Sequence, residues 1–307
     1  MKTGLVIQST GKWYKVATDG NISDCRLRGK LRLDDKEVTN PVAVGDFVDV
    51  HYEDDKTGSI TNIHQRKNYI PRQATHGRRG EQILVANIDQ AWAVLSVRKP
   101  KLKTGFIDRF LVTCEAYEVN PGIIINKIDL AGKKDLNMLD DIHGLYKGLG
   151  YKIIFTSIEQ PDTLVTLKQE LSQKTSVFIG PSGVGKTSLL NAIDPSLNLA
   201  VGEISNYSNK GKHTTTFARL IKLKDGGYIA DTPGIRELGL VNIEPYELSL
   251  FYPEMKKYRN DCKFYNCTHS HEPGCRVAEA FEEGLIHPDR YNSYLNILES
   301  LEVENRT

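Results

Sequence analysis

Two stretches decide the central fold of this chain: Asn126–Asp129 (NKID) and, further along, Gly180–Thr187 (GPSGVGKT). The second matches the glycine-rich phosphate loop, whose backbone N–H groups surround phosphates. The first matches the N-K-x-D motif that recognises guanine, and ordinary small G domains place it after the phosphate loop. A third stretch, Asp231–Gly234 (DTPG), matches the D-x-x-G switch motif and comes last. This order predicts a complete G domain that is circularly permuted.

The phosphate loop follows a predicted buried strand, Thr175–Ile179, and precedes a predicted helix. We expect Lys186 to reach the β- and γ-phosphates and Thr187 to offer its hydroxyl to Mg²⁺. Asp231 ends another predicted strand and is expected to hold the Mg²⁺ shell, while Gly234 turns its N–H toward the γ-phosphate. The nucleotide contacts expected from the loop are Gly180, Pro181, Ser182, Gly183, Val184, Gly185, Lys186, Thr187 and Ser188.

Guanine specificity is predicted from side chains that follow two other strands. The carboxylate of Asp129 can accept hydrogen bonds from N1–H and N2–H₂ of guanine, which adenine cannot supply, so adenine would leave the charge unpaired. Asn126 and Lys127 belong to the same motif. Thr156 and Ser157 follow the second strand, where a backbone N–H meets guanine O6 or the pair simply caps a helix.

Composition limits the remaining possibilities. The 307 residues are 39% hydrophobic, which supports sizeable cores in more than one domain. No run approaches the ~18 apolar residues of a membrane span, and the first residues do not form a signal peptide. Five cysteines, three of them clustered late, argue against a secreted disulfide framework. We therefore predict a cytoplasmic protein without membrane association, and we separately expect it to be a monomer.

The N-terminal region is basic and is patterned as short strands. Residues 1–80 carry 14 Lys/Arg against 10 Asp/Glu, whereas residues 241–307 carry 7 against 12. Alternating stretches at 4–8, 12–17, 23–27, 47–52 and 59–63 predict an all-β OB barrel, a common platform for single-stranded nucleic acid. Trp13 or Tyr14 either stacks on a base or packs in the core. The predicted RNA-binding residues, if the run is more than a solvated face, are Arg26, Arg28, Lys30 and Arg32.

A predicted helix follows the strand at 90–97. Apolar residues at 107, 110, 111, 114 and 117 recur at helical spacing. The pattern predicts that Cys114 lies in the core and that Asp108 and Arg109 face solvent.

The C-terminal region carries a different chemistry. Cys262, Cys267, His269 and Cys275 form C-x₄-C-x-H-x₅-C, a spacing that can close a tetrahedral Zn²⁺ site, with His271 as the rival fourth ligand. Four protein ligands leave no open position, so one structural zinc ion per chain is expected. Predicted helices at 245–258, 278–283 and 291–301 flank the ligands and complete a small zinc-binding domain that the metal stabilises.

The combination of these three parts resembles the bacterial ribosome small-subunit-dependent GTPases of the RsgA family over essentially the whole chain. The stretch Gly211–Thr216 (GKHTTT) is also similar to the switch I motif of that family. The resemblance implies a cytoplasmic factor that binds the 30S subunit and its 16S rRNA late in subunit maturation. It implies GTP hydrolysis to GDP with Mg²⁺, slow in the free protein and faster on the subunit. One threonine among residues 214–216 is expected to meet Mg²⁺, and Thr215 is the candidate.

The hydrolytic group is less evident from the motifs. Ras-like enzymes place a water-orienting Gln after the switch glycine, and Ile235 stands there instead, which predicts slow intrinsic turnover. His213 in switch I is the candidate for orienting or activating the water; alternatively it contacts RNA or caps a turn. The competing hypothesis for the whole chain is an RNA-binding guanine-nucleotide sensor with negligible hydrolysis.

The expected architecture is thus an OB barrel at 1–65, a linker at 66–82, an α/β circularly permuted P-loop GTPase domain at 83–240 and a helical zinc-binding domain at 241–307. Because the chain leaves the G domain just after Asp231–Gly234, the switch loop is tethered directly to the zinc-binding domain. A γ-phosphate that orders this loop would shift or release that domain.

Overall fold

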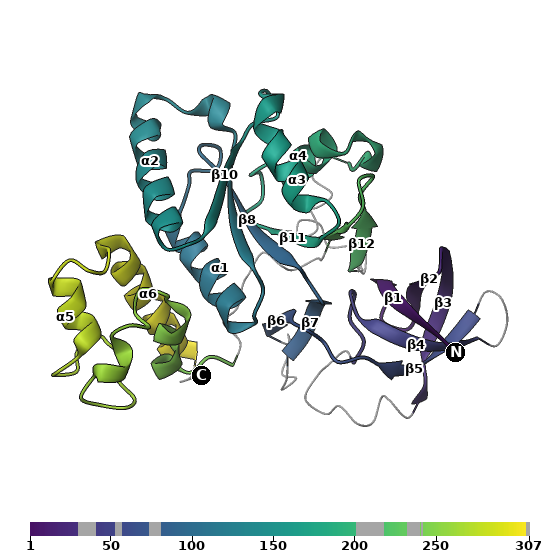
Figure 1. Cartoon of the computed structure of the whole chain (residues 1–307), viewed down its shortest axis with the longest axis horizontal. Helices are drawn as coiled ribbons and strands as arrows, with labels where there is room; N and C mark the ends of the chain where they lie inside the picture. The colour runs from purple at the N-terminus through teal and green to yellow at the C-terminus, as the bar shows by residue number, and fades with distance from the viewer. Residues whose placement is uncertain are drawn as a thin grey trace.

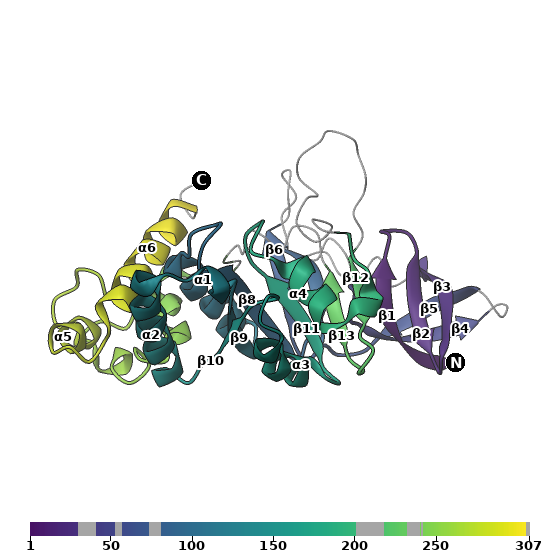
Figure 2. The same cartoon turned by 90° about the horizontal axis from the view of Figure 1, so that it is seen from above.

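The computed structural model describes residues 1–29, 41–52, 57–73, 81–200, 218–231, 240 and 242–304. The chain forms three parts side by side, with a central α/β domain between an N-terminal barrel and a C-terminal helical module (Figures 1 and 2). Within the described residues, no helix combines the length and apolar character needed to cross a membrane.

The N-terminal part is a closed five-stranded barrel. Its strands are β1 (Lys2–Ser9), β2 (Tyr14–Thr18), β3 (Asn21–Leu27), β4 (Phe47–Tyr52) and β5 (Thr57–Ile63). They are ordered β1-β2-β3-β5-β4, and a β1–β4 ladder closes the barrel. Alternate side chains of each strand point inward, as a two-residue period requires. Val6, Val16, Val48 and Ile60 fill the interior, and Tyr14 joins them at 4% exposure. Tyr14 is therefore a core residue, so of the two alternatives for this side chain the structure supports packing in the core.

The segment expected to be a linker contains part of a hairpin. Strands β6 (Tyr69–Gln73) and β7 (Glu81–Ala86) pair antiparallel as a separate two-stranded sheet. Val44, just before β4, also bridges to Val85. Residues 69–73 and 81–86 thus form a two-stranded sheet between the barrel and strand 90–96. The exact domain boundaries stay predictions.

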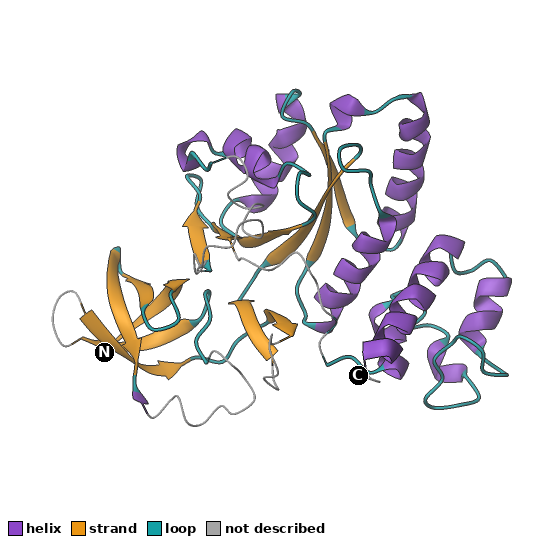
Figure 3. Ribbon diagram, turned by 180° about the vertical axis from the view of Figure 1, so that it is seen from behind, coloured by secondary structure: helices purple, strands orange, loops and turns teal. Residues whose placement is uncertain are grey.

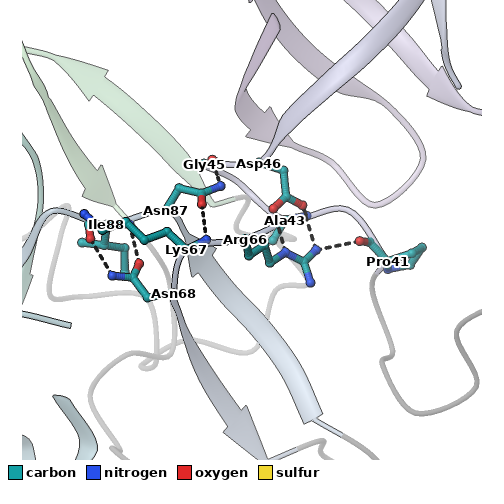
Figure 4. Close-up of polar contacts among 9 residues, drawn as sticks. All are labelled: Pro41, Ala43, Gly45, Asp46, Arg66, Lys67, Asn68, Asn87 and Ile88. Atoms are coloured by element: carbon teal, nitrogen blue, oxygen red, sulfur yellow. Dashed lines mark hydrogen bonds and ion pairs between the residues drawn. The ribbon is translucent and has the colours of Figure 1, made fainter. Parts of the chain in front are cut away.

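Polar contacts connect the barrel to the start of the central domain (Figure 4). Arg66 donates from Nε and Nη2 to the two oxygens of the fully buried Asp46, at 2.7 and 2.8 Å. Asn87 donates to the carbonyl of Gly45 at 2.9 Å. Gly45 has a φ of +93°, and a Cβ there would lie 2.0 Å from the carbonyl oxygen of Ala86. Glycine therefore permits the close approach of the two backbones.

The central domain is built on parallel strands. They are β8 (Gln90–Ser96), β9 (Pro121–Asn126), β10 (Lys152–Thr156), β11 (Thr175–Ile179) and β13 (Tyr228–Asp231), in the order β10-β9-β8-β11-β13. β12 (Arg219–Lys222) is antiparallel to β13. At its outer edge β12 meets β1 through the pair Gln8–Arg219, so one eleven-stranded sheet runs from the G domain into the barrel.

Helices cover both faces of the central sheet (Figure 3). α1 (Thr104–Ala116) and α2 (Lys133–Gly148) share one apolar core with β8 and β9. α3 (Val165–Leu171) and α4 (Lys186–Ile193) share a second core on the other face. Near-continuous apolar strands such as β8, buried along its whole length, are typical of a sheet covered on both sides.

The C-terminal part is a helical module. Two 3₁₀ helices, η5 (Pro245–Phe251) and η6 (Arg259–Asp261), precede α5 (Arg276–Glu282) and α6 (Pro288–Glu304). The expected helix over 245–258 is thus confined to its first half and is 3₁₀. The core of the module includes Leu240 and Ile243 at its start and Val112 from α1. The α1 helix therefore packs on the sheet with one face and on this module with another.

This double packing corrects one expectation from the sequence. Asp108 does not face solvent: it is 2% exposed and accepts hydrogen bonds from Arg290 Nη1 of α6 and, at 2.7 Å, from the hydroxyl of Tyr146. Arg290 also donates from Nε to Glu254 at 2.6 Å. Arg109 is half-buried and donates to Ser300 at 2.6 Å. Helical periodicity identified the face of α1 that meets the sheet, but it could not show that a second module covers the polar face. Cys114 is buried, as expected.

Candidate nucleotide and metal sites

The permuted motifs meet at one edge of the central sheet. Parallel strands β8, β9, β10, β11 and β13 end on the same side, and the carboxyl edge of such a sheet is where ligands bind. Asn126 ends β9, Thr156 ends β10 and Asp231 ends β13, while the phosphate loop follows β11. Motifs that lie far apart along the chain are therefore neighbours in space, whatever their order.

Asn126 joins the guanine-recognition motif to the phosphate loop. Asn126 is 2% exposed, and its side-chain amide donates to the carbonyl of Val184 at 2.9 Å. Its oxygen accepts from the hydroxyl of Thr156 at 3.1 Å. Gly185 adopts a φ of +97°, and a Cβ there would lie 2.6 Å from Asn126 Nδ2. Glycine is therefore required both by the backbone conformation and by the packing of Asn126.

Lys127 makes a second connection to the same loop. The backbone of Lys127 adopts the left-handed helical conformation, with a φ of 61°. Its side-chain ammonium donates to the carbonyls of Gly183 at 2.6 Å and Lys99 at 2.7 Å. Partial burial lowers the pKa of Lys127, and Asp129 opposes that shift. The lysine thus ties two loops at the edge of the sheet together.

Asp129 is exposed and lies in the 3₁₀ turn that follows β9 at this edge of the sheet. Its carboxylate accepts a short hydrogen bond from the hydroxyl of Ser157. The backbone N–H of Ser157 donates to the hydroxyl of Thr163 at 2.9 Å. Thr163 was not identified from the sequence, because it lies six residues beyond Ser157 and only the 3₁₀ helix η3 (Pro161–Leu164) brings it back. The side chains of Asp129 and Ser157 thus lie together.

The lysine of the phosphate loop folds back over the loop itself. Lys186 Nζ donates to the carbonyls of Gly180 at 2.7 Å and Pro181 at 2.9 Å. Lys186 and Thr187 are 5% and 4% exposed in the first turn of α4. Gly180 lies so close to β8 that a Cβ would be 2.0 Å from the carbonyl oxygen of Val94. The loop is therefore packed firmly against its neighbouring strand.

Asp231 places a further carboxylate at this edge. Its side chain is 14% exposed, and Arg219 Nε donates to its Oδ2 at 3.0 Å. The sequence indicated Asp231 but not Arg219, because β12 follows switch I without a motif of its own. Gly234, His213 and Thr215 lie outside the described residues.

The structure brings Cys262, Cys267, His269 and Cys275 together, with ligand atoms all within 4.8 Å of one another. The distances are 3.9 Å from Cys262 Sγ to Cys275 Sγ, 3.5 Å from Cys262 Sγ to His269 Nδ1 and 3.3 Å from Cys275 Sγ to His269 Nδ1. Zn–S bonds of about 2.3 Å and Zn–N bonds of about 2.0 Å at tetrahedral angles separate sulfur atoms by about 3.8 Å and sulfur from nitrogen by about 3.5 Å. The four residues fit a tetrahedral zinc site.

Neighbouring groups orient the ligands. His269 Nε2 lies 3.0 Å from the hydroxyl of Ser249, which in turn accepts from Arg259 Nε at 3.0 Å. This contact directs His269 Nδ1 toward the thiols, as ring partners of metal-bound histidines do. Burial lowers the pKa of His269 to about 4, which keeps the imidazole neutral for ligation. His271 is exposed and its ring contacts Ser270 instead, so it is not the fourth member.

The predicted RNA-binding residues are described only in part. The guanidinium of Arg26 lies over the ring of half-exposed Trp13, 3.8 Å from its centroid, and Arg28 is exposed on the barrel surface. Lys30 and Arg32 lie outside the described residues. An arginine stacked on an indole forms a flat, cationic surface of the kind on which bases stack.

Together the sheet, the motifs at its edge and the two flanking modules define a circularly permuted GTPase with an N-terminal β-barrel and a C-terminal Cys₃His module. Comparison with known proteins agrees. The RsgA GTPase family profile matches residues 63–241, and the RsgA N-terminal domain profile matches residues 3–60.

Similar proteins cover nearly the whole chain. "Small ribosomal subunit biogenesis GTPase RsgA 2" of Bacteroides thetaiotaomicron is 45% identical over 97% of both chains. The crystal structure of YjeQ from Thermotoga maritima is 36% identical, covers 98% of both chains and superposes with a TM-score of 0.78. That of YloQ, a circularly permuted GTPase, is 32% identical, covers 99% of this chain and 96% of the other, and has a TM-score of 0.75. The chain belongs to the RsgA family of GTP-hydrolysing enzymes.

Proposed function

We propose that this GTPase binds the 30S ribosomal subunit and assists its late maturation, with slow hydrolysis in the free protein and faster hydrolysis on the subunit. The observation that carries the proposal is the full-length match, barrel and C-terminal module included, to relatives named small ribosomal subunit biogenesis GTPases. The permuted G domain alone would support only nucleotide binding. A subunit partner also implies action in the cytoplasm.

For the base, the proposal assigns recognition to Asp129 with support from Asn126, Lys127, Thr156 and Ser157. The Asp129 carboxylate is exposed and is held by the Ser157 hydroxyl, so it is available to guanine N1–H and N2–H₂. The N–H of Ser157, assigned to guanine O6, donates to the hydroxyl of Thr163. The hydrogen bond from the Ser157 N–H to Thr163 therefore has to break when guanine binds.

For the phosphates, the proposal assigns binding to the loop from Gly180 to Ser188 and to Gly234. The two carbonyls that hold Lys186 keep its ammonium at the loop. Phosphate oxygens, which carry negative charge, bind an ammonium more strongly than neutral carbonyls do. Lys186 is therefore expected to turn from the loop to the β- and γ-phosphates.

Magnesium fits the oxygen ligands near this loop. Thr187, Asp231 and Thr215 would hold it, because a hydroxyl and a carboxylate are the hard ligands that Mg²⁺ prefers. When bound, the ion neutralises charge on the β- and γ-phosphates. Thr187 and Asp231 flank the phosphate loop from α4 and β13.

Zinc is assigned a structural role, with one ion per chain. Four protein ligands saturate a tetrahedral ion and leave no position for substrate. The ligands come from segments with little regular structure before α5, and Cys267 and Cys275 belong to the apolar core of the module. The metal therefore joins segments that hydrogen bonds within helices do not.

The switch loop connects the G domain to the C-terminal module in the chain. Residues 232–239 separate Asp231 from Leu240, which is buried in the core of the C-terminal module. A γ-phosphate that orders the loop would therefore shift the C-terminal module relative to the G domain. The module is also held to α1 by the buried contact between Arg290 and Asp108, so the readout of the nucleotide state has to work against that contact.

His213 is assigned to orient the attacking water, since Ile235 has no polar group for this task. Arg26, Arg28, Lys30 and Arg32 are assigned to phosphates of 16S rRNA, and the protein acts as a monomer.

Multiple-turnover phosphate release, measured with and without purified 30S subunits, tests the function. A rate that rises with 30S subunits but not with 50S subunits is expected, and Lys186→Ala should remove it. Equal rates with both subunits would contradict the proposed partner.

A further inference from the structure

Strand β12 lies between the barrel and the carboxylate on the metal side of the nucleotide site. Its first residue, Arg219, is paired with Gln8 of β1 on one side and with Asp231 of β13 on the other. The N–H of Ser9 also donates to the carbonyl of Ala218 at 3.2 Å. The backbone of one residue is thus joined to the barrel and to the strand that ends in Asp231.

The side chain of Arg219 completes this connection. Its Nε donates to Asp231 Oδ2 at 3.0 Å, with the arginine side chain 40% exposed and the aspartate side chain 14% exposed. Ion pairs this accessible contribute little to stability, because water screens them. The contact instead restricts the orientation of a largely buried carboxylate, for which the rigid guanidinium is well suited.

We propose that Arg219 is a positioning residue that holds the Asp231 carboxylate toward the Mg²⁺ shell, and that strand β1 of the barrel supports Arg219 in turn. The inference rests on the proposed function, in which Asp231 is the metal-side carboxylate. The two oxygens of a carboxylate offer about four acceptor sites, so a hydrogen bond from Arg219 is compatible with acceptance from a metal-bound water. Groups that orient metal ligands in this way typically change metal affinity 10–100-fold.

The direction of the change in Mg²⁺ affinity distinguishes a positioning Arg219 from one that only repels the ion. A guanidinium next to the carboxylate also repels a cation, so a purely competing Arg219 would weaken Mg²⁺ binding. Removing the arginine then lowers metal affinity if it positions Asp231 and raises the affinity if it competes.

The measurement is the affinity for a fluorescent GDP analogue, titrated against Mg²⁺ and repeated in EDTA. Arg219→Gln is expected to raise the Mg²⁺ concentration for half-maximal tightening about 10-fold, with the affinity in EDTA unchanged. Arg219→Lys should recover part of the loss. Lys222→Gln, which removes an exposed charge from the same strand, should match the parent. Ser9→Pro, which removes the N–H bonded to Ala218, should shift the Mg²⁺ requirement in the same direction as Arg219→Gln.

An unchanged or lower Mg²⁺ requirement in Arg219→Gln would overturn the positioning role. A parent-like Ser9→Pro variant, with Arg219→Gln impaired, would overturn the part assigned to the barrel. Asp231→Ala separates these outcomes from failure of the proposed function. If Asp231→Ala keeps the Mg²⁺ dependence of the parent, the assignment of Asp231 is wrong. If the parent does not bind GDP, the proposed nucleotide site itself is wrong.

Discussion

The side-chain amide of Asn126 donates a 2.9 Å hydrogen bond to the backbone carbonyl of Val184 and so joins the base-recognition strand to the phosphate loop. In the chain the first residue precedes the second by 58 positions, in the reverse of the usual order of these motifs. Permutation leaves the contact intact, because a parallel sheet brings strand ends together irrespective of their order in the chain. The same geometry underlies the predictions for the nucleotide site.

Base specificity depends on Asp129. We predict that Asp129→Asn weakens GTP binding on the order of 10- to 100-fold, because the amide offers a donor where guanine needs an acceptor. The same change should strengthen binding of xanthosine triphosphate, which carries an oxygen at that position. Equilibrium titration with both nucleotides measures this, and Glu159→Gln, an exposed carboxylate on the neighbouring loop, is the control. Equal GTP affinity in Asp129→Asn and the parent would remove Asp129 from base recognition.

The two histidines of the C-terminal module form a matched pair for the metal site. His269→Ala should lose the single zinc ion and destabilise the module, because one of four ligands is gone. His271→Ala should keep the zinc, since its ring lies outside the cluster. Elemental analysis of the purified variants checks both statements, and GTP binding should survive in each. Absence of stoichiometric zinc from the parent would contradict the site.

The buried contact between the G domain and the C-terminal module depends on Arg290. Arg290→Met should lower the free energy of unfolding of the module by about 3–5 kcal/mol, because Asp108 and Glu254 stay buried without their counter-charge. Arg276→Met, which breaks an exposed pair with Glu279 in the same module, should cost at most about 1 kcal/mol. Urea unfolding followed by circular dichroism compares the two. Similar costs would show that the contact is unimportant.

The basic run of the barrel should contribute to subunit binding. Neutralising Arg26, Arg28, Lys30 and Arg32 is expected to weaken association with 30S subunits and to flatten its salt dependence, because phosphate contacts release counterions. Binding measured across a range of salt concentrations gives the slope. The control removes four exposed lysines of the G domain: Lys134, Lys147, Lys168 and Lys222. If both sets of substitutions change the slope equally, the barrel has no special role.

Catalysis should depend on His213. We predict that His213→Ala keeps GTP affinity and 30S binding but loses about 10²-fold or more of the stimulated turnover, as expected when a positioned acid–base group is removed. The variant should remain on the subunit in its GTP form. Phosphate release and co-sedimentation with subunits measure the two effects. A stimulated rate within a few-fold of the parent would assign the water to the backbone or to rRNA.

Local motifs were sufficient to predict much of the fold and the clustering of the four Cys and His side chains. Strand β11 has the predicted bounds, and the cluster of Cys262, Cys267, His269 and Cys275 formed with the predicted members. These predictions succeeded because each depends on chemistry within a short segment. A phosphate loop needs its glycines in sequence, and a zinc ligand set with short spacings can close within one loop region.

Only the tertiary structure decided the features that depend on distant segments. Asp108 has the helical position of a solvent-facing residue, yet Arg290 from α6 buries it. The alternating pattern of the strand does not decide whether Tyr14 lies on the surface or in the core, and closure of the barrel places it inside. Arg219 has no motif, and only the pairing of β12 with both β1 and β13 brings it to Asp231. Sequence periodicity reports the faces of an element, whereas the partners that cover those faces are set by packing between elements remote in the chain.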